Sequence, residues 1–414
     1  MPSGRTGSGR RRRGTREGRS PRGDDREERT VTTRDRLRVG VVGVGHLGRH
    51  HARILSGLEG VELVGVADLR ADQARTVAEP LGAAAFADYR ELLGRVDAVS
   101  VAVPTTSHRE VAGAFLSRGI HAMVEKPLAA SVLEGRELVE LADRAGVVLA
   151  VGHVERFNPI WELSRDRCPR PRYIDAERLG VYTFRSTDIG AVLDLMIHDI
   201  DLILSLVGSP VVSVSALGTP VFGGHEDLAQ ARLEFEDGCV ADIAASRASY
   251  QPSRRMRLWG AEGYASIDFA SRQATIVRPS ESLRRGEMDL RGVDLSRPDA
   301  VRDHLFGTVL RVETLAPEAP ADQLTAELTD FVRAIRTGTA PRVPGSEALD
   351  ALRVAEQILA GLRSYRLDAG TEVPGAPHVR TSGAPATEPR PSLAGPKLWK
   401  LRPPGGPPSR SPRA

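Results

Sequence analysis

Residues 38–52 read RVGVVGVGHLGRHHA: a short apolar run, then glycines at Gly43, Gly45 and Gly48, then the start of a helical pattern. The apolar run suits a buried parallel strand, and this glycine spacing suits a tight turn between a strand and a helix. Gly43 permits the turn, and Gly45 lets the backbone approach a pyrophosphate. Gly48 lets the helix pack close to the strand. The pattern predicts a dinucleotide-binding turn with the phosphates at a helix N-terminus.

A second apolar run, Val61–Ala67, strengthens this interpretation because it ends at Asp68. An acid about 20 residues after the last glycine is placed to accept hydrogen bonds from an adenosine ribose. We therefore expect the cofactor to contact the turn, including His46 and Leu47, as well as Asp68. The carboxylate favours NAD, since it would repel the extra phosphate of NADP. Arg70 lies close enough to weaken that preference, which leaves NADP as an alternative.

From Leu37 to residue 157 apolar runs alternate with helical patterns, as a doubly wound parallel sheet requires. Further strands are expected at 83–86, 97–103, 121–124 and 147–151, and helices at 71–79, 89–93, 105–118 and 131–144. Ligands of open α/β sheets bind outside the carboxyl ends of the strands. Candidate cofactor contacts at these ends are Pro104, Thr105, His108, Glu125 and Lys126, with His153 after the last strand.

From residue 158 the pattern changes to long alternating strands, which predicts a second, α+β domain on a mostly antiparallel sheet. Its strands are expected at 173–179, 211–217, 227–235, 239–247, 254–259 and 264–269, with one helix at 192–207. The polar segment 279–320 is expected to have little regular structure. Two final helices, near 322–336 and 346–365, could return to the first domain. The predicted domains are thus 37–157 and 158–370, between tails 1–36 and 371–414.

The charge of the chain is concentrated in these tails. The whole chain of 414 residues has a formal charge of +3, whereas Met1–Thr30 and Thr371–Ala414 each carry +5. The stretch between them is therefore at −7, which argues against a nucleic-acid-binding surface on the folded body. The second tail also holds eleven of the 28 prolines, and both tails are expected to be disordered. Nucleic-acid association through the tails is an alternative role for them.

The composition also indicates the cellular compartment in which the protein works. Two cysteines, Cys168 and Cys239, are too few for a disulfide framework. No apolar run approaches the length of a membrane span. The arginines at 10–13 invite a twin-arginine export signal, but no apolar segment follows them. We expect a cytoplasmic protein without membrane contact.

Chemistry is expected on the apolar helix that contains Asp194, His198 and Asp201, whose spacing puts all three on one helical stripe. A carboxylate beside an imidazole orients the ring and raises its basicity, which suits a general base that takes a hydroxyl proton. Lys126 would stabilise the developing alkoxide and help fix the ribose. In the alternative interpretation Asp194 caps a helical turn and His198 is a core histidine with ordinary partners.

The ordered combination of motifs resembles the Gfo/Idh/MocA oxidoreductases over about residues 37–365. The motifs are Gly43-x-Gly45-x-x-Gly48, Glu125-Lys126-Pro127 and Asp194-x-x-x-His198-x-x-Asp201. The resemblance implies a Rossmann domain, a C-terminal domain with a large open sheet, and NAD(P). It also implies catalysis by Lys126, Asp194 and His198, and a homodimer or homotetramer formed through the open sheet. The family commonly has glycine where this chain has Met196, which could narrow the pocket.

A closer likeness rests on Gly152-His153-x-x-Arg156-Phe157-Asn158-Pro159 and Arg185-Ser186-Thr187-Asp188. These motifs resemble a subgroup that oxidises a UDP-N-acetylhexosamine at its 3-hydroxyl. Arg156, Asn158, Arg185 and Asp201 are the candidate substrate contacts, because arginine forks match phosphate oxygens. For Arg185 an exposed loop charge is an equal alternative. The function expected is an NAD(P)-dependent sugar dehydrogenase; the alternatives are a polyol, inositol or free-sugar dehydrogenase, or a non-catalytic NAD(H) sensor.

A metal site is not expected. His46, His50 and His51 are close in sequence, but His50 and His51 are adjacent and cannot share a helical face. No cysteine or acidic ligand accompanies them.

Overall fold

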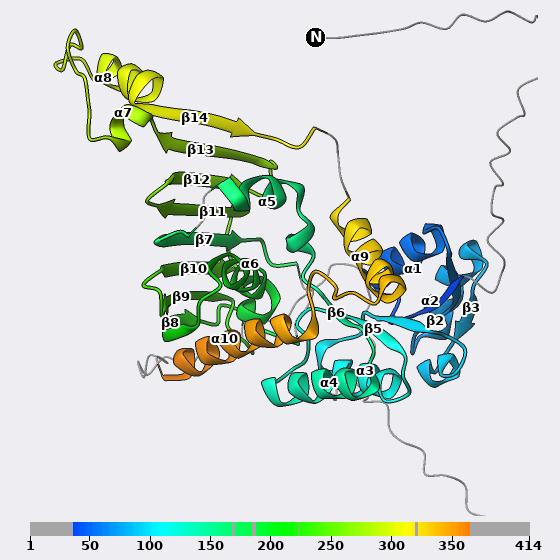
Figure 1. The fold of residues 1–414 in the computed structure, drawn as a ribbon. Coiled ribbons are helices and arrows are strands. Elements are labelled where there is room, and N and C mark those ends of the chain that lie inside the picture. The colour runs from blue at the N-terminus through cyan, green and yellow to red at the C-terminus, as the bar shows by residue number, and fades with distance from the viewer. Residues whose placement is uncertain (1–35, 168–169, 184–187, 223, 319–321, 365–414) are drawn as a thin grey trace, which may run out of the picture. The chain divides into compact units, whose positions relative to one another are not determined.

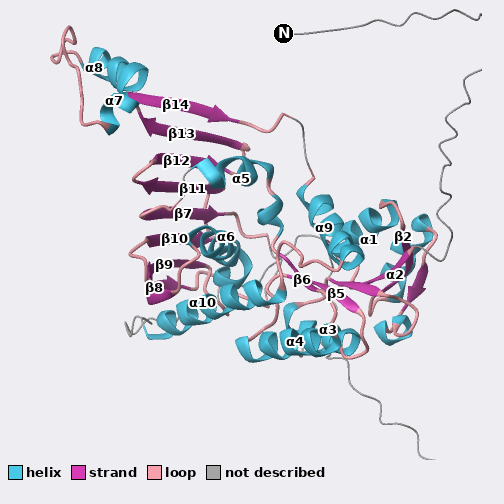
Figure 2. Ribbon diagram, viewed as in Figure 1, coloured by secondary structure: helices cyan, strands magenta, loops and turns pink. Residues whose placement is uncertain are grey.

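The computed structural model describes residues 36–364, apart from 168–169, 184–187, 223 and 319–321. Both predicted tails therefore lie outside the described residues. The two sheets and the helices around them are drawn in Figure 1 and, by element type, in Figure 2. No helix of the described residues combines the length and the apolar character that crossing a membrane demands.

The first sheet has six parallel strands in the order β3-β2-β1-β4-β5-β6. They are β1 (Leu37–Val42), β2 (Val61–Ala67), β3 (Ala84–Phe86), β4 (Ala98–Val101), β5 (His121–Glu125) and β6 (Leu149–Gly152). Helices α1 (Gly48–Gly57), α2 (Ala71–Ala78), α3 (His108–Leu116) and α4 (Val132–Ala145) connect them. The strand order reverses between β1 and β4, and that switch point is where an α/β sheet binds its ligand. The doubly wound sheet is confirmed.

Local sequence explains these elements well. Every residue of β4 is buried, as is expected of a strand covered by helices on both faces. Helix α4 begins at its predicted cap, because the Ser131 hydroxyl accepts a hydrogen bond from the backbone N–H of Glu134 at 3.2 Å. It ends at Gly146, whose left-handed conformation stops the helix. The ends of α4 are thus set by local sequence, and this helix connects β5, which precedes Lys126, to β6.

The second sheet has eight strands in the order β14-β13-β12-β11-β7-β10-β9-β8. They are β7 (Tyr173–Leu179), β8 (Val211–Thr219), β9 (Leu228–Phe235), β10 (Val240–Ser246), β11 (Ser253–Gly260), β12 (Gly263–Asp268), β13 (Gln273–Pro279) and β14 (Leu310–Leu315). Only β7 and β10 pair in parallel among these described strands. The predicted mostly antiparallel sheet is confirmed.

One face of this sheet is covered by helices from the same chain. Helix α6 (Ile197–Val207) packs on β7 and β10, α5 (Pro159–Ser164) on β12 and β13, and α10 (Gly345–Ser364) on β8. Figure 1 shows α6 in front of the sheet and α10 beside the edge strand β8. Immediately before α6 the segment η7 (Val192–Met196) is π-helical. A π-helix winds more residues into a turn than an α-helix and is frequent at functional sites.

The last two helices return to the first sheet, as the sequence suggested. Helix α9 (Gln323–Thr337) packs on α1, and its residues Leu328, Phe331 and Val332 join a core shared with β1 and α1. Helix α10 contacts both α4 and α6. The connection between them adds an isolated bridge from Pro344 to Ala150 at the edge of β6. The domain limits at 157 and 158 stay a prediction.

The expectation for segment 279–320 was wrong in part. The structure has α7 (Glu281–Arg284), α8 (Pro298–His304), the π-helical η8 (Leu305–Val309) and strand β14 there. Strand β13 was also not predicted. Strand β14 is the last strand of its sheet, and its charged residues and the exposed Val312 are typical of an edge strand. Its sequence therefore lacks the apolar alternation that marks buried strands.

Candidate active site

The glycine turn that follows β1 has the geometry that a dinucleotide requires. Gly43 has a φ of +80°, and a Cβ there would lie 2.6 Å from the carbonyl oxygen of Ala102. A Cβ at Gly48 would lie 1.8 Å from the carbonyl oxygen of Gly43, whereas one at Gly45 would meet no atom within 4 Å. Packing thus excludes side chains at two positions and leaves open space at the third. His46 and Leu47 are exposed in the same turn.

Asp68 links this turn to the end of β2. Its Oδ2 accepts a hydrogen bond from the backbone N–H of Val44 at 3.0 Å, and its Oδ1 accepts one from Arg70 at 2.9 Å. A carboxylate oxygen can accept more than one hydrogen bond. Asp68 therefore keeps acceptor capacity for the two hydroxyls of a ribose. These residues fit NAD.

The three residues after β4 that were predicted to contact the cofactor differ in their exposure to solvent. Pro104 is exposed, whereas Thr105 and His108 are buried. The His108 ring nitrogens lie 2.8 Å from the carbonyl oxygen of Pro127 and 3.0 Å from that of Val103. His108 therefore holds together the segments that follow β4 and β5, instead of presenting its ring to the cofactor as expected.

Glu125 has a partner that the sequence analysis missed. His51 Nε2 lies 3.0 Å from Glu125 Oε1, and His51 Nδ1 lies 2.7 Å from the Ser100 hydroxyl. Burial would raise the pKa of Glu125, but His51 and Lys126 outweigh it and lower that pKa. Glu125 is therefore a buried carboxylate directly beneath Lys126. The spacing of His51 from Gly48 and Leu55 on α1, three and four residues, could have revealed its inward position.

Lys126 and Asp194 meet although Lys126 follows β5 of the first sheet and Asp194 lies in the π-helical segment η7, before the helix that packs on the second sheet. The ammonium group donates hydrogen bonds to the Asp194 carbonyl oxygen at 2.6 Å and to Oδ1 at 3.0 Å. Both side chains keep some exposure, 14% for Lys126 and 21% for Asp194. The end of β5 and the π-helical segment thus form one polar centre that a ligand can reach.

His198 does not pair with Asp194 as the sequence analysis expected. The Asp194 carboxylate, in the π-helical segment η7, accepts its hydrogen bond from Lys126. The ring lies instead edge-to-face against His153, with ring centroids 6.3 Å apart. Burial, followed by the charges of Lys126 and Arg178, sets the pKa of His198 well below its ordinary value. His198 is therefore neutral near pH 7, as a proton acceptor must be.

His153 is fully buried at the end of β6, and within the described residues neither ring nitrogen has a hydrogen-bond partner. Its Nδ1 lies 4.0 Å from Asp201 Oδ2. Met196, the departure from the family pattern, is also fully buried and belongs to the main core. Its side chain packs there among other apolar side chains.

The structure uses three of the four candidate substrate contacts for internal interactions. Arg156 donates hydrogen bonds to both carboxylate oxygens of Asp201, from Nε at 2.7 Å and from Nη2 at 3.0 Å. Its Nη2 also donates to Glu347 at 2.9 Å. Asn158 caps α5. These side chains are almost completely buried, and a buried charge needs its partner. Their expected role in substrate binding is corrected accordingly; Arg185 lies outside the described residues.

A second buried ionic cluster was not predicted. Arg178 binds Asp199 with Nε at 2.9 Å and Nη2 at 3.0 Å, and Glu155 with Nη1 at 2.9 Å. Burial raises the pKa of Asp199, against the opposing charge of Arg178. The cluster joins β7, α6 and the segment after β6, so it fixes the helix of His198 against the second sheet. The sequence carries no local signal for it, since the three residues lie on three elements.

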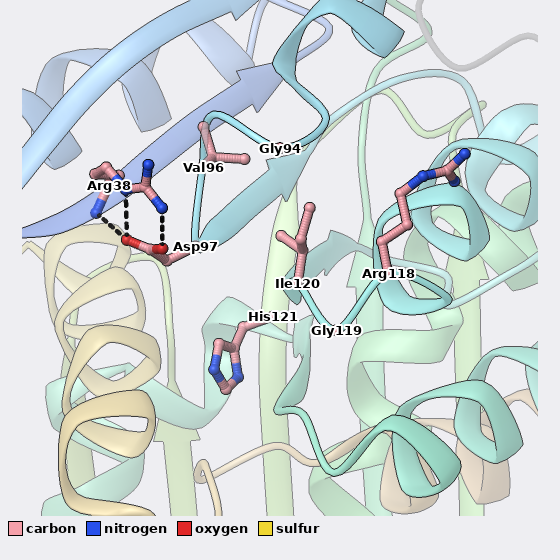
Figure 3. A pocket seen from close by; sticks show the side chains of 8 residues that line it. All are labelled: Arg38, Gly94, Val96, Asp97, Arg118, Gly119, Ile120 and His121. Atoms are coloured by element: carbon pink, nitrogen blue, oxygen red, sulfur yellow. Dashed lines mark hydrogen bonds and ion pairs between the residues drawn. The ribbon is translucent and has the colours of Figure 1, made fainter.

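A hollow of about 410 Å³ lies at the opposite end of the first sheet. Figure 3 shows Arg38, Asp97, Arg118 and His121 around it, at the amino ends of the strands. Arg38 is paired with Asp97, and His121 Nδ1 accepts a hydrogen bond from Val148. The hollow is therefore separate from the cofactor turn and Lys126. Among the described residues no group of three or more His, Cys, Asp or Glu side chains could hold a metal ion.

Comparison with known proteins identifies relatives along the whole described chain. The family description "Oxidoreductase family, NAD-binding Rossmann fold" matches residues 37–153, and "GFO/IDH/MocA C-terminal domain" matches 164–266. UDP-N-acetylglucosamine 3-dehydrogenase from Acidithiobacillus ferrooxidans is 36% identical over 80% of this chain and 98% of its own length. Its solved structure superposes with a TM-score of 0.69 at 34% identity, over 80% of this chain and 99% of that one.

A more distant relative acts on a different kind of substrate. Myo-inositol 2-dehydrogenase from Thermotoga maritima is 27% identical over 80% of this chain and 99% of its own length. The relatives are dehydrogenases, and the first of them takes a sugar nucleotide.

Proposed function

The chain belongs to the Gfo/Idh/MocA family of NAD-binding oxidoreductases, and on that basis we propose that it oxidises a secondary hydroxyl group of a sugar nucleotide. The substrate we propose is a UDP-N-acetylhexosamine, oxidised at its 3-hydroxyl. The observation that carries the proposal is the contact of Lys126 with Asp194 at the end of β5. It brings a cation to the segment that leads into His198, whose pKa is lowered by burial and then by the charge of Lys126.

The chain's own residues divide the work as follows. The glycine turn and Asp68 would hold NAD, which would supply the hydride acceptor. Lys126 donates a hydrogen bond to the substrate oxygen and stabilises the negative charge that develops there. His198 accepts the hydroxyl proton while the hydrogen on the same carbon leaves as hydride. The products are a ketone, reduced cofactor and one proton. Asp194 holds Lys126 in place through two hydrogen bonds.

Two further observations favour a sugar nucleotide over a free polyol. The relative with 36% identity is a UDP-N-acetylglucosamine dehydrogenase and is covered over 98% of its length, whereas the inositol dehydrogenase is 27% identical. Besides burial, the charges of Lys126, Arg178 and Arg254 lower the pKa of His198, and of these three cations Arg254 alone has no ion pair within the described residues. A cation without a carboxylate partner attracts an anionic substrate. An inositol or free-sugar dehydrogenase is the second candidate.

The test is cofactor reduction, followed by absorbance of the reduced nicotinamide. The panel contains UDP-N-acetylglucosamine, UDP-N-acetylgalactosamine, N-acetylglucosamine and myo-inositol, each with NAD and with NADP. Reduction with a UDP-sugar but not with the free sugars supports the proposal. Reduction with myo-inositol alone overturns the substrate class. No reduction with any compound, together with tight NADH binding, supports a non-catalytic sensor instead.

We also propose a cytoplasmic homodimer or homotetramer formed through the second sheet. Alternate residues of β9 are exposed on the face that α6 and α10 do not cover. Light scattering after size-exclusion chromatography measures the mass directly, and a monomer over the whole concentration range contradicts this proposal.

A further inference from the structure

The arginines around the candidate site differ sharply in their partners. Arg156 and Arg178 are buried and fully engaged by carboxylates. Arg254, on β11, is exposed, and its guanidinium group has no hydrogen bond or ion pair within the described part of the chain. The engaged arginines cannot bind a ligand without losing their partners, whereas Arg254 can.

Strand pairing puts Arg254 on the side of the sheet that faces the site. In the antiparallel pair of β7 and β11, Arg254 lies directly opposite Arg178, and opposite residues point to the same face about 5 Å apart. That face is the one covered by α6, because Arg178 binds Asp199 of α6. The buried Met256 and Leu258 follow Arg254 on the same face. Arg254 is thus a solvent-exposed residue on the face of the sheet that α6 partly covers.

Arg254 has no ion pair of its own within the described residues, although its charge reaches the carboxylates of Glu155 and Asp199, which Arg178 binds. Arg178, directly opposite, has the same sign, and its two carboxylates are already bound to it. Like charges opposite one another in a sheet repel. The charge of Arg254 also reaches His198, which lies next to Asp199 in the chain. An exposed cation near a reactive imidazole, with a like charge across the strand pair, is relieved by an anionic ligand.

We propose that Arg254 binds the diphosphate of the substrate. The inference rests on the proposed function, because it identifies the part of a sugar nucleotide that Arg254 would hold while the sugar lies beside Lys126 and His198. A guanidinium fork matches two phosphate oxygens. Contact with this non-reacting part would orient the sugar ring.

The neighbouring Arg255 provides a matched control. It lies on the same strand, points to the other face, and its Nε is 3.4 Å from Asp268 Oδ2. We expect Arg254→Gln to raise KM for the UDP-sugar at least tenfold with an unchanged KM for NAD. Arg254→Lys should recover part of the loss, since it keeps the charge without the fork. Arg255→Gln should leave both constants unchanged. Equal effects of Arg254→Gln and Arg255→Gln on the UDP-sugar overturn the proposal.

Binding of UDP and of pyrophosphate, measured by calorimetry with the NAD-loaded protein, tests Arg254 without any turnover. We expect Arg254→Gln to weaken both at least tenfold, and added salt to weaken wild-type binding. If wild-type protein oxidises no sugar nucleotide but binds UDP through Arg254, the proposed function fails and the anion site stands. If it oxidises the UDP-sugar and Arg254→Gln binds UDP as wild type does, the proposed function stands and the assignment of Arg254 falls.

Discussion

Lys126 and Asp194 lie 68 residues apart in the chain, yet the lysine ammonium group touches both the carbonyl oxygen and the carboxylate of Asp194. The contact joins the end of β5 in the first sheet to the π-helical segment η7, which precedes the helix that packs on the second sheet. Each of these two segments therefore contributes one polar group to the same centre, and the consequences can be tested residue by residue.

Replacing Lys126 with methionine should lower kcat at least about 100-fold, because one electrostatic donor to a developing oxyanion typically contributes that much. NAD binding, followed by NADH fluorescence titration, should change little, since the glycine turn and Asp68 are intact. Arg136→Met removes an exposed cation of α4 and serves as the control. Turnover near the wild-type value in Lys126→Met contradicts the assigned role.

The pH dependence of kcat/KM should report His198. The residue must be neutral to accept a proton, and its pKa lies well below the ordinary 6.5 because of burial and then Lys126 and Arg178. Activity should therefore stay level as pH falls through 6.5 and decline only at lower pH. An acid limb centred at or above pH 6.5, the ordinary value for an exposed histidine, is the result that contradicts this.

Asp68→Asn should weaken NAD binding about tenfold, which corresponds to about 1.4 kcal/mol. The amide keeps one acceptor for the turn but loses the charge that we expect to bind both ribose hydroxyls. The ratio of NADP to NAD affinity should rise, since repulsion of the extra phosphate is removed. Asp72→Asn, at an exposed position on α2, is the control. Unchanged dissociation constants for both cofactors argue against Asp68 as the ribose partner.

Arg178→Met should destabilise the fold by about 3–5 kcal/mol, because it leaves the buried carboxylates of Asp199 and Glu155 without their counter-ion. Urea unfolding measures the loss. Arg109→Met, on α3 beside the first sheet, removes the exposed ion-pair partner of Glu137 and should change stability little. Similar losses in the two variants would show that burial is not the cause.

Glu327→Gln should stabilise the protein, increasingly so as pH rises. Glu327 of α9 is buried and, within the described residues, has no hydrogen-bond partner. Burial, followed by the charge of Glu125, raises its pKa well above 4.5. The folded state then binds the proton more tightly than the unfolded state, so stability is full below pH 4.5 and falls as pH rises towards the raised pKa.

The measurement for Glu327→Gln is the free energy of unfolding at pH 5, 7 and 9. The exposed Glu59 gives a control, Glu59→Gln, whose difference from wild type should not vary with pH in this way. A constant difference between Glu327→Gln and wild type at all three values contradicts the prediction.

Much of the first sheet is predictable because its signals are local. The glycine turn, the run ending at Asp68 and the cap at Ser131 each lie within a few residues of the structure they determine. The strands of the second sheet are predictable for the same reason, through their alternation. Their order is not, since the pairing of β7 with β10 and β11 depends on residues more than 60 positions away.

The sequence predicted several residues of the candidate site, but it did not predict which residues contact one another. Spacing alone predicted that Asp194 pairs with His198, whereas the Asp194 carboxylate binds Lys126 from another part of the chain. Arg156 and Asp201 were each expected to bind a ligand, but they bind one another across 45 residues. Single residues reveal their chemistry in the sequence, whereas the choice between a ligand and an internal partner is made by tertiary packing.

Helix α9 has a bearing on how this protein is made. The core around β1 and α1 includes Leu328 and Phe331, which a ribosome adds about 300 residues after Val39. A nascent chain that has emerged only through β6 has every strand of its nucleotide sheet but lacks this layer. An N-terminal fragment cut after β6 would expose the apolar surface that α9 covers, and we expect it to be less stable than the same residues in the whole chain.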